Sequence, residues 1–443
     1  MPDDTLVIPL STLAFGGDAI GRVPEDNLHA GLAVFVPYAL PGETVRLRLL
    51  EVKSGHARGE LLEVLDPSPD RVIPRCPHYF SIQNQHSTIY NSSCGGCHYQ
   101  HLSYPEQLAA KTAILRDQLE RIGGLKDPAL LPAVASPSPW NYRNHIQFHL
   151  TPQGKLGFEA HRSHRVIPIR ECHLPEAPIN QLWPQLELEA LPGLERVSLR
   201  LGAGEEMMLI LEGGDPQSLE LIIEELPISA VHLGPAGPLV MAGGEALDIE
   251  VEALRPNPGG SIPGDLPLHR SFRVSADSFF QVNTAQAGMM VAHLLSNLPL
   301  TPTTTLLDVY CGVGLFSAFL ASRVGRLVGI EISPSACQDF EMNLNEFDNV
   351  ELYEAAAEEA LPALDLRPDV ILIDPPRAGL GLPALDGLVN LSPQILAYVS
   401  CDPATLARDA HRLVANGYHL RQITPFDLFP QTYHIESISF WER

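Results

Sequence analysis

Features that would place this chain among membrane or exported proteins are missing. In 443 residues, no apolar run reaches the roughly 18 residues that a membrane-spanning helix requires. The first residues, MPDDTLVIPL, are acidic and lack the basic region of a secretory signal peptide. We therefore expect a cytoplasmic protein without membrane contact, and its length predicts two or three domains.

Cysteine is scarce, with seven in the whole chain. An odd number of cysteines in a large chain without an export signal disfavours a disulfide framework. Metal binding or catalysis is the better expectation for Cys76, Cys94, Cys97, Cys172, Cys311, Cys337 and Cys401.

Basic residues are also few: 29 Lys and Arg stand against 53 Asp and Glu, for a net charge of -24. This balance argues against generic polyanion binding, because phosphate contacts need clustered cations. One stretch departs from it, since residues 141–170 contain a single acid, Glu159, among the basic residues Arg143, Lys155, Arg162, Arg165 and Arg170.

The first two-fifths of the chain mix strands with one clear helix. Residues 1–65 alternate short apolar runs with Gly and Pro turns, which predicts a small β-barrel closed by the linker DPSPD. Apolar residues at helical spacing, a Pro near the start and a Gly-Gly stop predict a helix over 104–125. Residues 142–170 again resemble strands. Residues 176–267 mix predicted strands with loop-like sequence and indicate no function.

From about residue 268, strands alternate with helices. This alternation predicts an α/β domain with a mostly parallel sheet covered by helices on both faces. The domains expected are therefore 1–65, 66–267 and 268–443. Folds like the last one bind ligands at the carboxyl ends of their strands.

The stretch LLDVYCGVGLFS, 306–317, runs from a strand through a Gly-X-Gly turn into a helix. Gly312 and Gly314 allow the backbone to approach a ligand closely, and Glu331 ends the next strand, where a carboxylate can accept both hydroxyls of a ribose. A plain tight turn or a nicotinamide site is an alternative. Ser317 occupies the third glycine position of the nicotinamide motif, which favours a nucleoside cofactor without a pyrophosphate.

A second strand, in DVILIDPPRAGLG, delivers Asp374 into a rigid Pro-Pro turn. Methyltransferases that act on amino groups place an aromatic ring after such a motif, whereas Arg377 stands here. Two interpretations stay open. The target atom is not an exocyclic amine, or the stretch is simply a buried strand with a solvated end.

Cys401 ends the strand of AYVSCDPATLARD, at the edge where such sheets hold their reactive groups. A thiolate that adds to C6 of a pyrimidine makes C5 nucleophilic toward a methyl group, and a base must then remove the C5 proton. Glu436, in YHIESISF, lies among apolar residues that would raise its pKa toward a useful range. A buried core cysteine and a solvated strand glutamate are the ordinary alternatives.

The remaining cysteines include a Cys-x2-Cys pair, Cys94 and Cys97, in SSCGGCH. Cys76 precedes the pair and Cys172 follows in RECHL. Four thiolates suit zinc or an iron-sulfur cluster. The spacing of radical enzymes, Cys-x3-Cys-x2-Cys, does not occur.

In their order, these motifs resemble the RNA (uracil-5)-methyltransferase family, in particular 23S ribosomal RNA members with an N-terminal TRAM barrel and a four-iron four-sulfur cluster. The resemblance spans nearly the whole chain and is weakest over 176–267. It is carried by GGDAIGR, VFVPYALPGE, DPSPDRVIPRC, CGGCHYQHLSYPEQLAAK, YRNHIQFHL, KLGFEAHRSHRVIPIREC, SFFQVNTAQA, DVYCGVGLFS, GIEISPSAC, DPPRAGLG, YVSCDPATLARD and HIES.

The resemblance implies a Rossmann-like methyltransferase domain, an OB-like TRAM barrel and a central α+β domain that binds the cluster, with helix 104–125 packed on the catalytic domain. It implies Cys401 as nucleophile and Glu436 as base. It also implies S-adenosylmethionine contacts from Gln281, Tyr310, Glu331 and Asp374, and cluster ligation by Cys76, Cys94, Cys97 and Cys172.

The expected substrate is one uridine of structured RNA, in 23S ribosomal RNA by preference or in transfer RNA, and the expected state is a monomer. A non-catalytic RNA-binding factor is the alternative from another class. Three departures from the family pattern concern single contacts: the long spacer HYFSIQNQHSTIYNSS between Cys76 and Cys94, Leu315 where Asn is frequent, and Ala356 where relatives are often polar.

The barrel sequence is acidic, with five Lys or Arg against nine acids over 1–65. We therefore expect residues 143–165, through Arg143, Arg162 and Arg165, to form the main phosphate-contacting strip.

Overall fold

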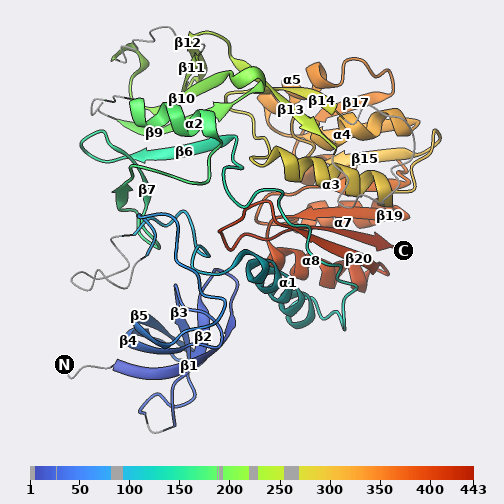
Figure 1. The fold of residues 1–443 in the computed structure, drawn as a ribbon. Helices are drawn as coiled ribbons and strands as arrows, with labels where there is room; N and C mark the ends of the chain where they lie inside the picture. The colour runs from blue at the N-terminus through green and yellow to red at the C-terminus, as the bar shows by residue number, and fades with distance from the viewer. Residues whose placement is uncertain are drawn as a thin grey trace.

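The computed structural model describes residues 5–25, 27–80, 93–186, 188, 193–218, 228–253 and 269–443. Three units follow one another along the chain (Figure 1). They are a small barrel, a second sheet drawn mostly in green, and a helix-covered sheet that contains the C-terminus. No helix within these ranges is long and apolar enough to cross a membrane. The inserted loop between Cys76 and Cys94 lies largely outside the described residues.

The first unit is the predicted β-barrel, which the structure confirms. Its strands close in the order β1-β2-β3-β5-β4. Closure leaves no open sheet edge, and the inward positions of alternating residues, such as Ile8, Val34 and Leu47, form its core. The strands are β1 (Thr5–Leu13), β2 (Ala19–Arg22), β3 (Ala33–Val36), β4 (Thr44–Val52) and β5 (His56–Asp66).

The second unit is a seven-stranded sheet in the order β12-β11-β10-β9-β6-β7-β8. It joins the strands expected over 142–170 to the region that the sequence left without a fold. Phe148 and Trp183 lie in its core. Its elements are β6 (His145–Leu150), β7 (Leu156–Glu159), β8 (Val166–Pro168), α2 (Ala177–Leu182), β9 (Leu194–Leu201), β10 (Met207–Gly213), β11 (Ile228–Gly234) and β12 (Gly237–Ala242), with short 3₁₀ turns η2 (Trp183–Gln185), η3 (Ala203–Glu205) and η4 (Pro216–Ser218).

Helix α1 (Tyr104–Arg121) connects the first two units to the third. It ends four residues before the predicted boundary of 125, because Gly124 adopts φ +68° and the Leu125 N–H folds back to the Leu119 carbonyl oxygen at 3.1 Å. Its buried face, which includes Leu115 and Leu119, packs beside α8.

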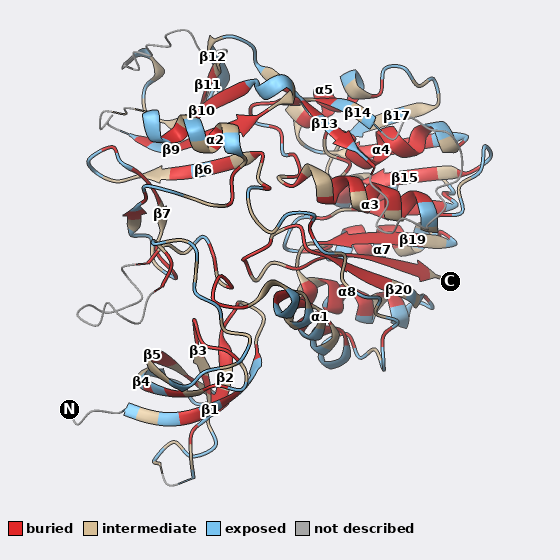
Figure 2. Ribbon diagram, in the orientation of Figure 1, coloured by how far each residue is buried: buried red, intermediate tan, exposed pale blue. Residues whose placement is uncertain are grey.

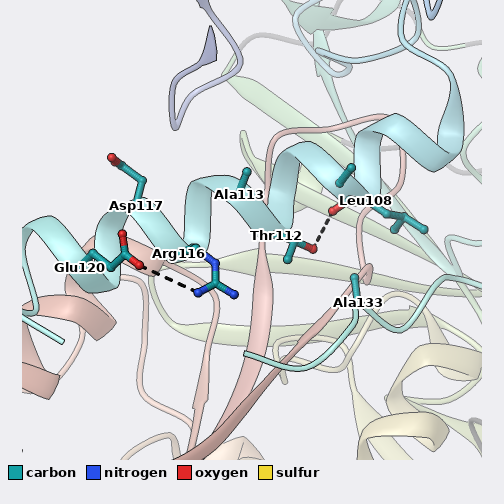
Figure 3. Close-up of a pocket in the computed structure, with 8 residues that line it drawn as sticks. Leu108, Thr112, Ala113, Arg116, Asp117, Glu120 and Ala133 are labelled. Atoms are coloured by element: carbon teal, nitrogen blue, oxygen red, sulfur yellow. Dashed lines mark hydrogen bonds and ion pairs between the residues drawn. The ribbon is translucent and has the colours of Figure 1, made fainter. Parts of the chain in front are cut away.

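The other face of α1 is open to solvent, as the pale blue segments of Figure 2 show. A hollow on this face is lined by short and charged side chains, among them Thr112, Arg116 and Glu120 (Figure 3). None of the candidate catalytic, cofactor-binding or cluster-ligating residues lines this hollow.

The third unit is the predicted doubly covered sheet, in the order β17-β16-β15-β18-β19-β21-β20. The first five strands in this order are parallel, and β21 runs antiparallel to both its neighbours. The strands are β15 (Thr305–Val309), β16 (Arg326–Glu331), β17 (Val350–Glu354), β18 (Val370–Ile373), β19 (Ile395–Ser400), β20 (His419–Phe426) and β21 (Glu436–Glu442).

Two cores lie on the two faces of this sheet because strand residues alternate between them. Leu307 and Ile371 face α6, α7 and α8, whereas Leu306 and Leu372 face α3, α4 and α5. The helices are α3 (Thr284–Asn297), α4 (Leu315–Leu320), α5 (Pro334–Asn343), α6 (Ala357–Ala363), α7 (Leu382–Leu391) and α8 (Pro403–Ala415), and the 3₁₀ turn η5 (Ala321–Arg323) follows α4.

A hairpin of β13 (Ala246–Glu252) and β14 (His269–Ser275) packs on the same face as α3. The expected domain boundary at 267 therefore separates two paired strands. Loop text between them suggested a linker, but Ile249 and Val251 are buried in the core of the third unit.

Asp339 of α5 fixes this hairpin to the sheet. Its fully buried carboxylate accepts hydrogen bonds from the Ser275 backbone N–H (2.8 Å), the Ser275 hydroxyl (2.8 Å) and the Ser278 hydroxyl (2.6 Å), and it pairs with Arg273. Four donors converge on one side chain that cannot reach water.

We expect Asp339→Asn to lower the free energy of unfolding by about 3 kcal/mol, because an amide loses the charge and part of the acceptor capacity that these donors need. Urea titration followed by circular dichroism measures this change. The control is Glu346→Gln, whose exposed ion pair with Arg270 should contribute less than about 1 kcal/mol. Equal losses in both variants would show that burial of Asp339 carries no special weight.

Candidate active site

The residues singled out by the sequence meet at the carboxyl edge of the third sheet. Tyr310 follows β15, Glu331 ends β16, Asp374 follows β18 and Cys401 follows β19. Because these strands are parallel and adjacent, their ends lie side by side. This edge is where open α/β sheets bind ligands.

The loop from Tyr310 to Gly314 has an unusual backbone. Tyr310 has φ +63°, a conformation that costs free energy in a non-glycine residue, and Gly312 and Gly314 have φ +54° and +89°. A Cβ on Gly314 would lie 2.4 Å from Leu344, whereas a Cβ on Gly312 would meet no atom within 4 Å. Gly314 is thus required for packing, and Gly312 faces open space that a ligand can fill.

Glu331 is held rigidly at the end of its strand. One carboxylate oxygen accepts the N–H groups of Ile332 and Ser333 at 2.8 Å, and the other accepts the Gly312 N–H at 2.9 Å. The acid and the glycine loop are therefore one unit, and an acid in this position can accept the hydroxyls of a ribose.

Asp308 lies beneath this loop and is fully buried. Its pKa is raised to about 7. Burial is the main cause, the hydrogen bond from the Ser317 hydroxyl (2.5 Å) opposes the rise, and the charges of Asp374 and Glu331 add to it. Ser317 at the third glycine position thus serves the carboxyl group of Asp308.

The turn that follows Asp374 is anchored to α8. The Leu380 N–H donates to Asp409 at 2.9 Å, and Arg408 donates to the carbonyl oxygens of Ala378 and Leu380 at 3.0 and 3.1 Å. These hydrogen bonds hold the turn at the end of β18. Burial raises the pKa of Asp374, which begins the turn, to about 7.

Cys401 and Glu436 face each other because β21 is antiparallel to β19. Ser400, the last residue of β19, pairs with Ser437 of β21. Cys401 follows Ser400 and Glu436 precedes Ser437, so the two lie beside each other. Glu436 is 3% exposed, and burial first and the charge of Asp374 second raise its pKa well above the usual value. A thiol and a carboxyl group thus share one corner of the site.

The pKa of Cys401 is raised to about 12, by burial first and then by the charges of Glu436 and Asp374, while Arg377 opposes the rise. Asp402 caps the following helix, its carboxylate accepting the N–H groups of Ala404 and Thr405 at 2.9 Å. Cys401 immediately precedes this cap, where the dipole of α8 opposes the rise in its pKa without cancelling it.

Gln281 is buried just before α3, and its backbone carbonyl accepts a hydrogen bond from Asn144 at 3.1 Å. This contact ties the approach to α3 to the second unit. The role of its side chain toward a cofactor remains a prediction from the family resemblance.

A separate cavity of about 230 Å³ collects the other predicted ligands, Cys76, Cys94, Cys97 and Cys172. Burial raises the pKa of every one of these thiols, to about 12 for Cys94 and about 11 for Cys172. Within the described residues, no group of three or more His, Cys, Asp or Glu side chains is close enough together to hold a metal ion. The four thiols therefore surround a hollow instead of converging on a point.

The three arginines of the expected phosphate-contacting strip have different surroundings in the structure. Arg143 lines the cysteine cavity and places its guanidinium 5.5 Å from the ring centre of Phe429. Arg162 pairs with Asp18 of the barrel at 2.7 Å, whereas Arg165 is exposed. An aromatic contact and an ion pair thus engage two of the three members, and the phosphate-contacting strip stays a prediction.

Comparison with known proteins now gives this geometry a context. The sequence profile described as tRNA (Uracil-5-)-methyltransferase matches residues 268–443, and the TRAM domain profile matches residues 5–62. An uncharacterized RNA methyltransferase of Thermosynechococcus vestitus is 34% identical over 98% of this chain and 97% of its own length. A second, from Halalkalibacterium halodurans, is 34% identical over 99% and 97%.

The chain belongs to the RNA (uracil-5-)-methyltransferase family. The crystal structure of the Pyrococcus abyssi tRNA (uracil-54, C5)-methyltransferase in complex with S-adenosyl-L-homocysteine has the same fold, with a TM-score of 0.67 and 22% identity over 98% of this chain and 100% of that chain. The family resemblance and the fold class are thus confirmed. As a member of this family, the protein is an S-adenosylmethionine-dependent RNA methyltransferase.

Two residues of this methyltransferase site gain importance only in three dimensions. Arg377 is the cation whose charge opposes the raised pKa values of both Cys401 and Glu436. Asp409 shapes the turn that carries Arg377. The sequence showed Arg377 as a departure from an aromatic residue, which was the available signal, whereas Asp409 had none.

We predict that the cofactor-free Asp308→Asn variant becomes more stable than the wild-type protein as pH rises from about 4 to about 7. The wild-type carboxyl stays protonated in the folded state up to pH about 7, while the unfolded chain ionises near its usual pKa of about 4. Wild-type stability is therefore lost between these pH values, and the asparagine variant avoids a loss of up to about 4 kcal/mol.

Urea unfolding at several pH values across this window measures the effect. Asp348→Asn, at an exposed position on the same domain, is the matched control. If the Asp308→Asn and wild-type profiles run parallel, the carboxyl group of Asp308 is ionised in the folded state and the prediction is wrong.

Proposed function

We propose that this protein methylates C5 of a specific uridine in structured RNA through a covalent bond between Cys401 and C6, and that 23S ribosomal RNA is its substrate. The observation that carries the proposal is the pairing of Cys401 with Glu436 at the carboxyl edge, beside the loop of Tyr310, Gly312 and Glu331. A thiol and a carboxyl group at one corner are the two groups that C5 chemistry needs.

Cys401 acts at the first and last steps, and Glu436 acts before Cys401 leaves. The Cys401 thiolate bonds to C6 of the flipped-out base, and the displaced electron pair makes C5 an enolate carbon. C5 then bonds to the methyl group as the carbon–sulfur bond of the donor breaks. Glu436 takes the C5 proton, the C5–C6 double bond re-forms, and the Cys401 thiolate leaves.

The charges of the site suit this order. Burial raises the pKa of Glu436 well above its usual value, which makes its carboxylate a stronger base toward the C5 proton. Asp374 and the thiol carry raised pKa values for the same reason. S-adenosylmethionine supplies an electrophilic methyl group and the positive charge of its sulfonium. Glu331 suits the ribose, and Gly312 leaves the backbone open toward it.

The choice of RNA rests on the domains that accompany the catalytic unit. The TRAM barrel and the cysteine cavity together resemble the ribosomal RNA members of the family, which supports 23S ribosomal RNA. The shared fold with the archaeal enzyme, named for uridine 54 of transfer RNA, supports transfer RNA as the second candidate.

The cysteine cavity fits a four-iron four-sulfur cluster held by Cys76, Cys94, Cys97 and Cys172. The four thiols line one cavity, where a positively charged group would offset the cost of burying their thiolates. Such a cluster would connect segments far apart in sequence and serve folding and RNA positioning, because the methylation reaction transfers no net electrons.

We expect wild-type protein to form a denaturation-stable complex with RNA that contains 5-fluorouridine, because fluorine at C5 cannot leave as a proton. Cys401→Ala should form none, whereas Glu436→Gln should form a methylated complex even on ordinary RNA. Labelled S-adenosylmethionine and denaturing gels detect both species. The trapped RNA, ribosomal or transfer, identifies the substrate.

The control for this experiment is Cys337→Ala, at a buried thiol on α5 that the proposal does not use. A wild-type protein that binds RNA and cofactor without forming a complex would exclude the covalent route and favour the RNA-binding factor.

The salt dependence of RNA binding should differ between variants of Arg165 and Arg143. We predict that Arg165→Ala weakens binding and reduces the slope of log affinity against log salt by about 1, because an exposed guanidinium is free to displace a counterion at a phosphate. Arg143→Ala should leave the slope unchanged, since its guanidinium lies against Tyr142 and Phe429. Filter binding at several salt concentrations distinguishes them, and a reversed order of slopes would contradict the assignment.

A further inference from the structure

Glu436 is preceded by a loop, residues 427–435, that joins β20 to β21 and is here called the base loop. Its residue Gln431 has φ +68°, and Asp427, Gln431 and Thr432 are each 2% exposed or less. A buried loop needs partners for its polar groups. In this protein, many of those partners come from outside the catalytic unit.

Helix α1 supplies the strongest of these contacts. The Lys111 ammonium donates to the Asp427 carboxylate at 2.6 Å and to the Phe429 carbonyl oxygen at 3.0 Å. Both side chains of this ion pair are almost fully buried, at 3% and 1% exposure. One lysine thus fixes the first residue of the base loop and a backbone carbonyl two residues later.

Gln107, one helical turn before Lys111, fixes the middle of the base loop. Its side-chain N–H donates to the Gln431 side-chain oxygen, and its oxygen accepts the Gln431 backbone N–H, both at 3.0 Å. The same amide also donates to the carbonyl oxygens of Tyr99 and Leu102. Gln107 therefore connects the cysteine-bearing segment to the base loop.

The cysteine-bearing segment also touches the base loop directly. The backbone N–H groups of His98 and Tyr99, which follow Cys97 at once, donate to the Gln431 carbonyl oxygen at 2.9 and 3.0 Å. The ring centre of His98 lies 4.5 Å from that of Tyr433, and the ring centre of Phe15, in the barrel, lies 5.6 Å from it. The barrel and the cysteine-bearing segment thus both contact this loop.

We propose that Lys111 and Gln107 are positioning residues for the proton-removal step: they hold the base loop so that the Glu436 carboxylate reaches the C5 proton after methyl transfer. This inference rests on the proposed function, because it takes Glu436 as the base. The hydrogen bonds to Asp427, Phe429 and Gln431 set the path of the chain into β21, whose first residue is Glu436.

The test is Lys111→Met, which keeps the length of the side chain and removes its charge. Turnover should fall roughly 10- to 100-fold, since a small displacement of a catalytic group has an effect of this size. Addition of Cys401 and methyl transfer precede the affected step, so the complex with 5-fluorouridine RNA should form to the wild-type extent. On ordinary RNA, a methylated covalent complex should accumulate. Amide hydrogen exchange of the base loop should become faster.

Arg116→Met is the matched control, because it removes a cation from the exposed face of the same helix. It should leave turnover, complex formation and exchange unchanged. Asp427→Asn is the milder second variant and serves if Lys111→Met does not fold. Its amide can still accept from Lys111, so it should show the same accumulation to a smaller extent.

A merely structural role would lower turnover and formation of the 5-fluorouridine complex together, with no accumulation on ordinary RNA, and this result would overturn the inference. Unchanged turnover in both variants would overturn it as well. Absence of the 5-fluorouridine complex in the wild-type protein would instead count against the proposed function itself, so the two failures are distinguishable.

Discussion

The antiparallel pairing of β21 with β19 is the constraint on which the candidate chemistry depends. In an all-parallel sheet, the first residue of a strand lies at the edge opposite to the ligand site. Because β21 runs in the other direction, its first residue, Glu436, lies at the same edge as Cys401 and Asp374. The sheet order therefore places a thiol and a carboxyl group together without any long loop having to carry either of them.

That placement concentrates acidic groups where water is scarce. Asp308, Asp374 and Glu436 all have raised pKa values, and burial is the first cause for each. A site of this kind prefers either protons or a positively charged ligand, and the two compete through the same free energy. A sulfonium cofactor fits this electrostatic requirement, whereas an anionic dinucleotide would add to the repulsion. Arg377 moderates the effect on Cys401 and Glu436 from the exposed side.

The sequence predicted what depends on local pattern and strand ends. The barrel, the doubly covered sheet and the positions of Gly312, Glu331, Asp374 and Cys401 at strand ends all follow from periodicity and turn residues. Pairing between distant segments could not be read in this way. Examples are the sheet that joins 145–168 to 194–242, and the β13–β14 hairpin that crosses the expected boundary at 267. Nothing local reveals that Lys111 meets Asp427, because that contact joins residues more than 300 positions apart.

The fate of the basic residues bears on how an acidic protein recognises RNA. Sequence order suggested a strip from Arg143 to Arg165, but side-chain direction is set by tertiary contacts: Arg143 turns toward Phe429 and the cysteine cavity, and Arg162 is neutralised by Asp18. With two of these three charges engaged, counterion release can supply only part of the affinity. The balance must come from RNA shape and from contacts with bases, which discriminate between sites more strongly than charge does. A net charge of -24 disfavours non-specific RNA, so the shortage of cations that weakens binding overall also limits binding at RNA sites whose shape does not fit.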